Sequence, residues 1–207
     1  MKPASVHSWL VLLVLLVYLS SPALVFATNV ETAVFAGGCF WCLEHDLGQI
    51  PGVISVKSGY TGGTVKNPTY SQVTAETTGH QESVEVRFDL DRISYRQLLH
   101  YYWQNIDPFD PNGQFCDKGD SYQAVIFTRG ELQSQEGYRS IEWAIDKLNT
   151  SPSQIKVRIE PASTFWPAEE YHQNFAERNA LKYNFYRYTC GRDRRLEQVW
   201  GSGASTQ

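Results

Sequence analysis

A short apolar segment runs into two glycines, a cysteine and two aromatic residues, and this junction constrains the fold more than any other part of the chain. It reads Ala36-Gly37-Gly38-Cys39-Phe40-Trp41, after the apolar run 32–36. Two glycines permit a tight turn at the end of a strand. The residues that follow can then begin a helix. We therefore predict a strand, a turn and a helix, with the Cys39 thiol at the N-terminus of the helix.

The predicted position would make Cys39 a nucleophile. Free N–H groups and the dipole at a helix N-terminus favour thiolate over thiol. Phe40 and Trp41 place two large aromatic side chains beside the sulfur, so we expect a small apolar pocket there. Cys42 completes a C-x-x-C pair, which at the start of a helix in a βαβ unit is typical of thiol–disulfide exchange.

The hydrophobic pattern predicts alternating strands and helices in the rest of the chain. We expect strands over 30–35, 53–60, 82–88, 122–127 and 155–159, and helices over 40–47, 94–104, 131–148 and 169–181. This order favours an α/β two-layer sandwich (α+β), with a split βαβ ferredoxin-like core and a mixed sheet. We expect a loop over 107–119 and an irregular C-terminal tail after Tyr188.

Composition indicates a globular protein without a nucleic-acid partner. Of the 207 residues, 19% are charged and 14% aromatic, and the formal net charge is −4. The chain contains no basic run that would attract nucleic acid or an anionic membrane surface.

Residues 1–27 have the organisation of a secretory signal peptide. Lys2 carries the only charged side chain there, residues 9–19 are apolar, Ser20-Ser21-Pro22 ends this run, and Val25-Phe26-Ala27 offers residues permitted before a cleavage site. We expect cleavage near Ala27, one mature domain over 28–207, and export to the periplasm. A membrane-anchored form is the alternative, although Pro22 interrupts a run that should reach about 20 residues to span a bilayer.

The cysteines all lie after this segment, where export would permit disulfides. They are Cys39, Cys42, Cys116 and Cys190, and their spacing does not choose among the possible pairings. A zinc site would use a second pair at C-x-x-C spacing, which Cys116 and Cys190 lack. We therefore expect no metal.

Five segments resemble the A-type peptide methionine sulfoxide reductases. They are GCFW at 38–41, GYTGG at 59–63, NPTY at 67–70, TGHQE at 78–82 and AEEYHQ at 168–173. They occur in the order expected for the family, and the resemblance spans roughly residues 32 to 190. One such motif would be weak, but five in order are specific.

The resemblance implies roles for the matching residues. Cys39 would be the nucleophile and Glu82 the general acid, while Phe40 and Trp41 would hold the methyl group on the substrate sulfur. The substrate would be the S epimer of methionine sulfoxide, free or in oxidised proteins. No bound metal or organic cofactor is implied.

Four further positions match residues that support this site in the family. Tyr70 and Tyr122 would donate hydrogen bonds to the sulfoxide oxygen, Asp117 would order the site, and His172 would support it. The chain departs from the family at Gln123, where arginine is expected. On the residues alone, each of these side chains also fits an ordinary structural position, and Glu82 fits a surface carboxylate at a strand end.

The residue types suit the chemistry. Sulfoxide sulfur is a poor electrophile until its oxygen is protonated, and a carboxylic acid kept neutral by an aromatic pocket can supply that proton. Attack by cysteine releases methionine and leaves a sulfenic acid. A second cysteine then forms an intramolecular disulfide, which an external dithiol such as thioredoxin reduces.

The choice of the second cysteine depends on the resemblance. Cys190 matches the family's resolving position on a mobile C-terminal segment. Cys116, beside Asp117, is the alternative, and Cys42 stands where many members have glycine. We expect the enzyme to act as a monomer.

Two other functions compete with this one. The first is a thiol–disulfide oxidoreductase that uses Cys39 and Cys42. The second is a non-enzymatic exported module with disulfides Cys39–Cys42 and Cys116–Cys190, in which Cys39 would be oxidised.

Overall fold

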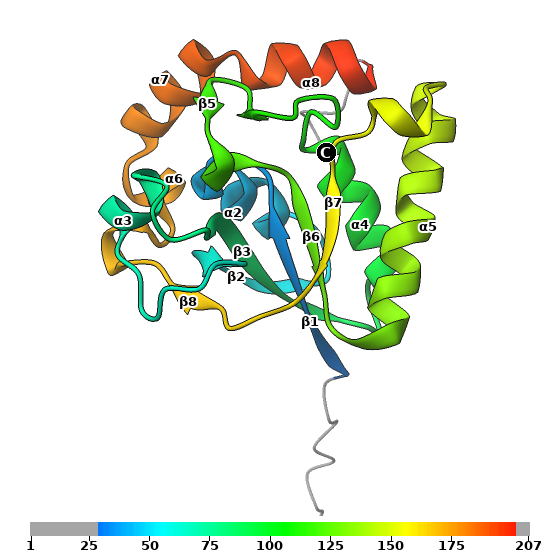
Figure 1. The fold of residues 1–207 in the computed structure, drawn as a ribbon, viewed down its shortest axis with the longest axis horizontal. Coiled ribbons are helices and arrows are strands. Elements are labelled where there is room, and N and C mark those ends of the chain that lie inside the picture. The colour runs from blue at the N-terminus through cyan, green and yellow to red at the C-terminus, as the bar shows by residue number, and fades with distance from the viewer. Residues whose placement is uncertain (1–28, 202–207) are drawn as a thin grey trace, which may run out of the picture.

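A six-stranded mixed sheet lies at the centre of the structure (Figure 1). The structure is a computed structural model and describes residues 29–201. The strands lie in the order β7-β6-β1-β3-β2-β8. Neighbouring strands are antiparallel, except that β6 and β7 are parallel. Their bounds are β1 (Val30–Ala36), β2 (Val53–Thr61), β3 (Gln81–Asp89), β6 (Val125–Thr128), β7 (Arg158–Pro161) and β8 (Trp166–Pro167).

The order of elements along the chain gives the predicted mixed α/β fold. From β1 the chain passes through α2 (Phe40–Gly48) to β2, and β3 then lies between β1 and β2. Strand β6 pairs with the other edge of β1. The carboxyl end of β1 and the amino end of β3 therefore meet in the middle of the sheet, where the backbone is held by neighbours on both sides.

Helices cover the sheet and bury its apolar side chains. Helix α2 packs on β2 and β3, and α5 (Gly130–Leu148) packs on β6, β7 and α4 (Tyr95–Gln104). A capping box at Ser94 and Gln97 fixes the start of α4. The stacked rings of Phe35 on β1 and Tyr102 on α4, with centroids 4.7 Å apart, show how closely the layers pack.

The expectation of an irregular C-terminal tail is wrong. Helix α7 (Ala180–Cys190) is followed by α8 (Arg192–Trp200), and the two run along the upper edge of the molecule in Figure 1. Gly191 has φ +70° and joins them. A glycine in this conformation ends a helix without steric cost. It therefore marks a helix end here rather than a flexible segment.

The predicted helix over 169–181 is broken into pieces. A 3₁₀ turn η3 (Glu170–His172), a short helix α6 (Phe175–Arg178) and then α7 replace it. Asn174 has a positive φ of 52°, which interrupts the helical path. Tertiary contacts of this segment with the site outweigh its helical propensity.

Other differences are local. The predicted loop 107–119 contains a hairpin of β4 (Gly113–Gln114) and β5 (Asp117–Lys118). Two strands begin three residues later than predicted, at residues 125 and 158, and the 3₁₀ turns η1 (Asp120–Tyr122) and η2 (Pro152–Gln154) precede them. The short helix α3 (Tyr70–Thr74) and strand β8 were not predicted. The predicted signal peptide lies outside the described residues, and within 29–201 no helix is long and apolar enough to cross a membrane.

Candidate active site

Cys39 lies at the turn between β1 and α2. It is the N-cap residue of α2 and its side chain is buried, with 6% exposed. Gly38 has φ +79°, and its N–H donates to the carbonyl oxygen of Tyr122 at 3.0 Å. A Cβ atom at Gly38 would lie 2.6 Å from Cβ of Gln114, so only glycine fits. The predicted strand, turn and helix around Cys39 are confirmed.

The sheet register brings Glu82 to the same place. On β3, Ser83 pairs with Ala36 of β1, and Glu82 pairs with Tyr60 of β2. Glu82 is therefore beside the residues that connect β1 to α2. Its Oε2 accepts a hydrogen bond from the N–H of Phe40 at 3.0 Å, and the residue is 2% exposed.

The environment keeps Glu82 protonated at neutral pH. Burial raises the pKa of Glu82 to about 8, the N–H of Phe40 opposes the rise, and the nearby Asp117 adds to it. Removing a carboxylate from water disfavours its charged form. Glu82 can therefore supply a proton at pH 7, as a general acid requires.

The thiol of Cys39 is not acidified. Burial raises its pKa well above the ordinary value, and Cys42, Glu82 and Asp117 raise it further. The expectation that the helix N-terminus lowers this pKa is wrong. The N–H of Phe40 donates to Glu82 and not to the sulfur, and the carboxyl groups of Glu82 and Asp117 add to the rise in the pKa of the thiol.

Cys42 has the opposite environment. Its pKa is lowered first by a hydrogen bond with Cys39, and the positive charges of Arg192 and Arg187 lower it further, while burial opposes them. Both cysteines are free thiols, and Cys42 is 1% exposed. Within the pair, negative charge is favoured on Cys42 and the proton on Cys39.

Trp41 forms a fixed aromatic wall beside the thiols. Its ring stacks on Phe175 with centroids 3.7 Å apart and an interplanar angle of 8°. Its Nε1–H donates to Nδ1 of His172 at 3.0 Å. Burial lowers the pKa of His172, so its ring stays neutral and accepts this bond. Phe40 closes the wall, with its centroid 4.9 Å from that of His172.

Tyr70 and Tyr122 bring two hydroxyl groups to Glu82. Tyr70 begins α3, and Tyr122 ends the turn before β6. Burial raises the pKa of Tyr70 to about 12, the charge of Glu82 adds to the rise, and a hydrogen bond with Tyr122 opposes it. Burial and the charge of Glu82 raise the pKa of Tyr122 as well. Both tyrosines therefore remain hydrogen-bond donors at neutral pH.

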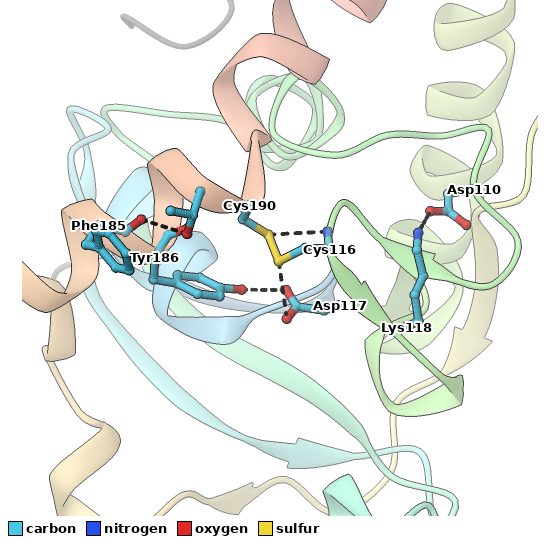
Figure 2. The surroundings of a disulfide bond; sticks show 8 residues. Asp110, Cys116, Asp117, Lys118, Phe185, Tyr186 and Cys190 are labelled. Atoms are coloured by element: carbon cyan, nitrogen blue, oxygen red, sulfur yellow. Dashed lines mark hydrogen bonds and ion pairs between the residues drawn. A yellow bond between two sulfur atoms is a disulfide. The ribbon is translucent and has the colours of Figure 1, made fainter.

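Asp117 links this site to a disulfide between Cys116 and Cys190 (Figure 2). Asp117 accepts a hydrogen bond from the hydroxyl of Tyr186, and one of its oxygens lies 3.9 Å from Sγ of Cys116. Tyr186 also packs edge-on against Trp41, with centroids 6.0 Å apart. Burial raises the pKa of Asp117, and the hydrogen bond with Tyr186 opposes the rise.

The structure therefore gathers most of the predicted site residues. These are Cys39, Phe40, Trp41, Cys42, Tyr70, Glu82, Asp117, Tyr122 and His172. Cys190 is bonded to Cys116 and is not the free thiol that direct attack on a Cys39 sulfenic acid would need.

The cysteine arrangement bears on the competing interpretations. Cys39 and Cys42 are reduced, whereas a module with two structural disulfides would have them oxidised. One group of three potential metal ligands occurs among residues 29–201, namely Cys116, Asp117 and Cys190. Two of its three ligand atoms are the disulfide sulfurs, so the group does not offer thiolates to a metal.

Several contributors were missed from the sequence. Tyr186 and Phe175 touch Trp41, and Glu169 accepts hydrogen bonds from Tyr60 at 2.8 Å and from the N–H of Tyr70 at 2.9 Å. Tyr183 and Tyr186 are three residues apart on the inner face of α7. That helical spacing was a usable signal, but the predicted helix ended at residue 181, before both tyrosines.

The fold and the site together define a thiol-based active site, in which a buried cysteine lies beside a protonated carboxylic acid and an aromatic wall. Residues 31–204 match the family described as peptide methionine sulfoxide reductase. The chain belongs to this family.

Two relatives illustrate the similarity. The chain is 52% identical over 182 residues to peptide methionine sulfoxide reductase MsrA 2 of Caulobacter vibrioides, covering 88% of this chain and 91% of the relative. It is 43% identical over 171 residues to MsrA of Bacillus licheniformis, covering 83% and 94%.

Solved structures share the fold. Reduced Mxr1 from Saccharomyces cerevisiae has a TM-score of 0.68 at 27% identity, covering 73% of this chain and 87% of that one. Methionine sulfoxide reductase A of Corynebacterium diphtheriae has a TM-score of 0.67 at 27% identity, covering 78% of each chain. Mxr1 in complex with Trx2 has a TM-score of 0.51 at 20% identity, covering 74% and 91%, which shows the fold alone.

Proposed function

We propose that this protein reduces the S epimer of methionine sulfoxide to methionine, both in oxidised proteins and as the free amino acid. One observation carries the proposal: Glu82, buried and protonated at neutral pH, lies at the first N–H of the helix that begins after Cys39. The reaction needs an acid for the sulfoxide oxygen and a nucleophile for the sulfur, and this geometry supplies both.

The remaining residues fit the same reaction. Glu82 protonates the sulfoxide oxygen while the hydroxyls of Tyr70 and Tyr122 hydrogen-bond to it. Phe40 and Trp41 hold the methyl group. Cys39 sulfur then forms a bond to the substrate sulfur, the oxygen transfers to Cys39, and methionine leaves. Cys39 is left as a sulfenic acid, whose O–H proton comes from Glu82, and the proton lost by the Cys39 thiol restores the Glu82 carboxyl group.

The activity test uses a small dithiol as the reductant and follows the loss of each sulfoxide epimer separately. The proposal expects consumption of the S epimer and little of the R epimer. If the protein exchanges disulfides in the absence of sulfoxide but consumes neither epimer, the Cys39–Cys42 oxidoreductase is the correct function instead.

The first turnover should slow as pH rises above about 8, the pKa of Glu82, because only the protonated carboxyl can donate. Rapid-quench measurement of methionine release avoids the separate pH dependence of the external reductant. Glu82→Gln should lack this dependence. A wild-type rate of release with the same pH dependence as that of Glu82→Gln would contradict the assignment of Glu82 as the acid.

The disulfide route begins, in our proposal, with Cys42. Its thiol hydrogen-bonds with Cys39 and its pKa is lowered, so it is positioned to attack the Cys39 sulfenic acid with loss of water. Cys190 takes part later, because it is held by Cys116 in this structure. The sequence-based assignment of Cys190 as the direct resolving residue stays a prediction that the next experiment tests.

In the fully reduced protein, Cys42→Ser should accumulate sulfenic acid at Cys39 after one equivalent of sulfoxide, detectable by mass after labelling with a 1,3-diketone. Cys190→Ser should not, because Cys42 still condenses with Cys39. The reverse pattern, with accumulation only in Cys190→Ser, would show that Cys190 resolves directly.

The proposal also covers the external reductant, the catalytic unit and the cellular location of the protein. A thioredoxin-like dithiol protein serves as the external reductant, and the complex of yeast Mxr1 with Trx2 supports this choice. The catalytic unit is a monomeric domain over 28–207 without a bound cofactor, and its strands β6-β1-β3-β2 form a ferredoxin-like core.

The chain is exported to the periplasm after cleavage near Ala27. An intact mass that still includes residues 1–27 would favour the membrane-anchored form.

A further inference from the structure

The segment that carries the Tyr70 hydroxyl has little regular structure of its own. Residues 62–69, between β2 and α3, form neither helix nor strand, and α3 has only five residues. His80 holds the start of this segment, because its Nδ1 accepts the N–H of Gly63 at 3.0 Å and its Nε2 lies 2.7 Å from the carbonyl oxygen of Val65. The far end, where Tyr70 lies, needs a separate anchor.

The carboxylate of Glu169 provides that anchor. Its Oε1 accepts the backbone N–H of Tyr70 at 2.9 Å, and its Oε2 accepts the hydroxyl of Tyr60 at 2.8 Å. Tyr60 is fully buried on β2 and pairs directly with Glu82 across the strands. Paired residues of neighbouring strands point to the same face of a sheet. One side chain therefore joins the strand pair that carries Glu82 to the segment that carries Tyr70.

We propose that Glu169 is a positioning residue of this site, whose carboxylate sets the position of the Tyr70 hydroxyl relative to the carboxyl group of Glu82. The inference rests on the proposed reductase function, in which both groups act on the sulfoxide oxygen. Glu169 acts through Tyr70 and not on the substrate. Its effect on the rate depends on the hydroxyl that it places.

The charge state of Glu169 suits this role. Burial raises the pKa of Glu169, but hydrogen bonds, including those from the N–H of Tyr70 and the hydroxyl of Tyr60, outweigh it, so the pKa is lowered. An ionised carboxylate only accepts hydrogen bonds, and both of its oxygens here face donors. Hydrogen bonds to an ionised acceptor are shorter and stronger than neutral ones. Glu82 and Glu169 therefore have opposite charge states at neutral pH, one as the acid and the other as the anchor.

The backbone of Glu169 supports the ring of the same tyrosine. Glu169 precedes the turn η3, and its carbonyl oxygen accepts the N–H of His172 at 2.9 Å. The imidazole ring of His172 lies 4.4 Å from the ring of Tyr70, centroid to centroid. Tyr70 is thus held at its backbone by the carboxylate and at its ring by His172. A change of the Glu169 side chain removes the first contact and leaves the backbone hydrogen bond to His172 in place.

A double-mutant cycle tests whether Glu169 acts through the Tyr70 hydroxyl. In the fully reduced protein, Glu169→Ala should lower the maximal rate of methionine release in a single turnover about tenfold or more, since a misplacement of about 1 Å can cost up to about 10²-fold. Tyr70→Phe keeps the ring and the backbone N–H but lacks the hydroxyl. In that background, Glu169→Ala should cost about a factor of two or less. Equal losses in both backgrounds would overturn the proposal.

Glu169→Gln is the conservative variant and carries the same cycle if the alanine variant does not fold. Its carbonyl oxygen can accept the N–H of Tyr70, but its amide group has no second acceptor for the hydroxyl of Tyr60. Its rate should therefore lie between those of the wild type and Glu169→Ala. A glutamine variant no faster than the alanine variant would overturn the hydrogen bond to Tyr70 as the cause.

Glu170→Ala is the matched control, because it removes a carboxylate from the next residue in the chain. The side chain of Glu170 is 84% exposed and pairs with Arg178 at 3.1 Å. An exposed ion pair contributes little, so this variant should stay within about a factor of two of the wild-type rate. A loss as large as that of Glu169→Ala would overturn the proposal, since any carboxylate in this segment would then have the same effect.

Failure of the proposed function would look different. In that case the reduced wild-type protein would release no methionine in a single turnover, and the cycle would have no rate to compare. Release of methionine by the wild type, together with equal losses in the two backgrounds, would leave the reductase function intact and remove only the role of Glu169.

Discussion

Replacing Cys39 by serine is expected to abolish sulfoxide reduction. A hydroxyl group is far less nucleophilic toward sulfur than a thiol, and it cannot form the sulfenic acid or the disulfide that complete the cycle. The side chain is buried at the turn between β1 and α2, and no other described cysteine lies at that turn beside Glu82. We expect no methionine above background, either in a single turnover or in steady state with dithiothreitol.

The variant must be folded for this result to be informative. Serine has nearly the same shape as cysteine, and the side chain of Cys39 makes no capping hydrogen bond to α2. A circular dichroism spectrum and thermal melt close to those of the wild type serve as the control. Cys42→Ser is the matched variant, since it should still release methionine in the first turnover. Sustained turnover by folded Cys39→Ser would remove Cys39 from the mechanism.

Glu82→Gln should lower the rate of the first turnover by about 10²–10⁴, the usual contribution of a positioned general acid. Glutamine keeps the shape, and its carbonyl oxygen can accept the N–H of Phe40 as the carboxyl does. It can also donate a hydrogen bond to the sulfoxide, but it cannot give up a proton. The loss should therefore appear mainly in the rate of methionine release and less in substrate affinity.

Glu85→Gln is the matched control on the same strand. Glu85 is three residues further along β3 and pairs with Arg129, at 2.9 Å, away from Cys39. An exposed ion pair of this kind contributes little, so this variant should react within about a factor of two of the wild type. If Glu82→Gln were equally active, Glu82 would be a structural cap of α2 and not the acid.

Local sequence was sufficient to predict the nucleophile's surroundings. Gly38 and the apolar run before it predicted the turn after β1, and the structure shows why, since a Cβ atom at Gly38 would collide with Gln114. The alternation of Val84, Val86 and Phe88 predicted β3, and all three side chains are buried. These features depend on backbone sterics and on a period of two along one strand, and both are properties of neighbouring residues.

The charge states could not be predicted from local sequence. The position of Cys39 at a helix N-terminus predicted an acidic thiol, but the pKa is raised because burial and the carboxyl groups of Glu82 and Asp117 outweigh the helix. Asp117 comes from a distant hairpin and Glu82 from the central strand. Their distances to the thiol are set by sheet register and loop packing, which span long separations in sequence.

The sequence by itself determined the strand, turn and helix around Cys39 and, through five motifs in order, the family to which the chain belongs. The tertiary structure alone decided that Cys190 pairs with Cys116, that the C-terminal residues form α7 and α8, and that Tyr186 joins the site. The physical reason is the range of the interactions. Turn sterics and hydrophobic periods act between near neighbours, whereas a disulfide across 74 residues and the burial of a carboxyl group depend on how distant segments pack.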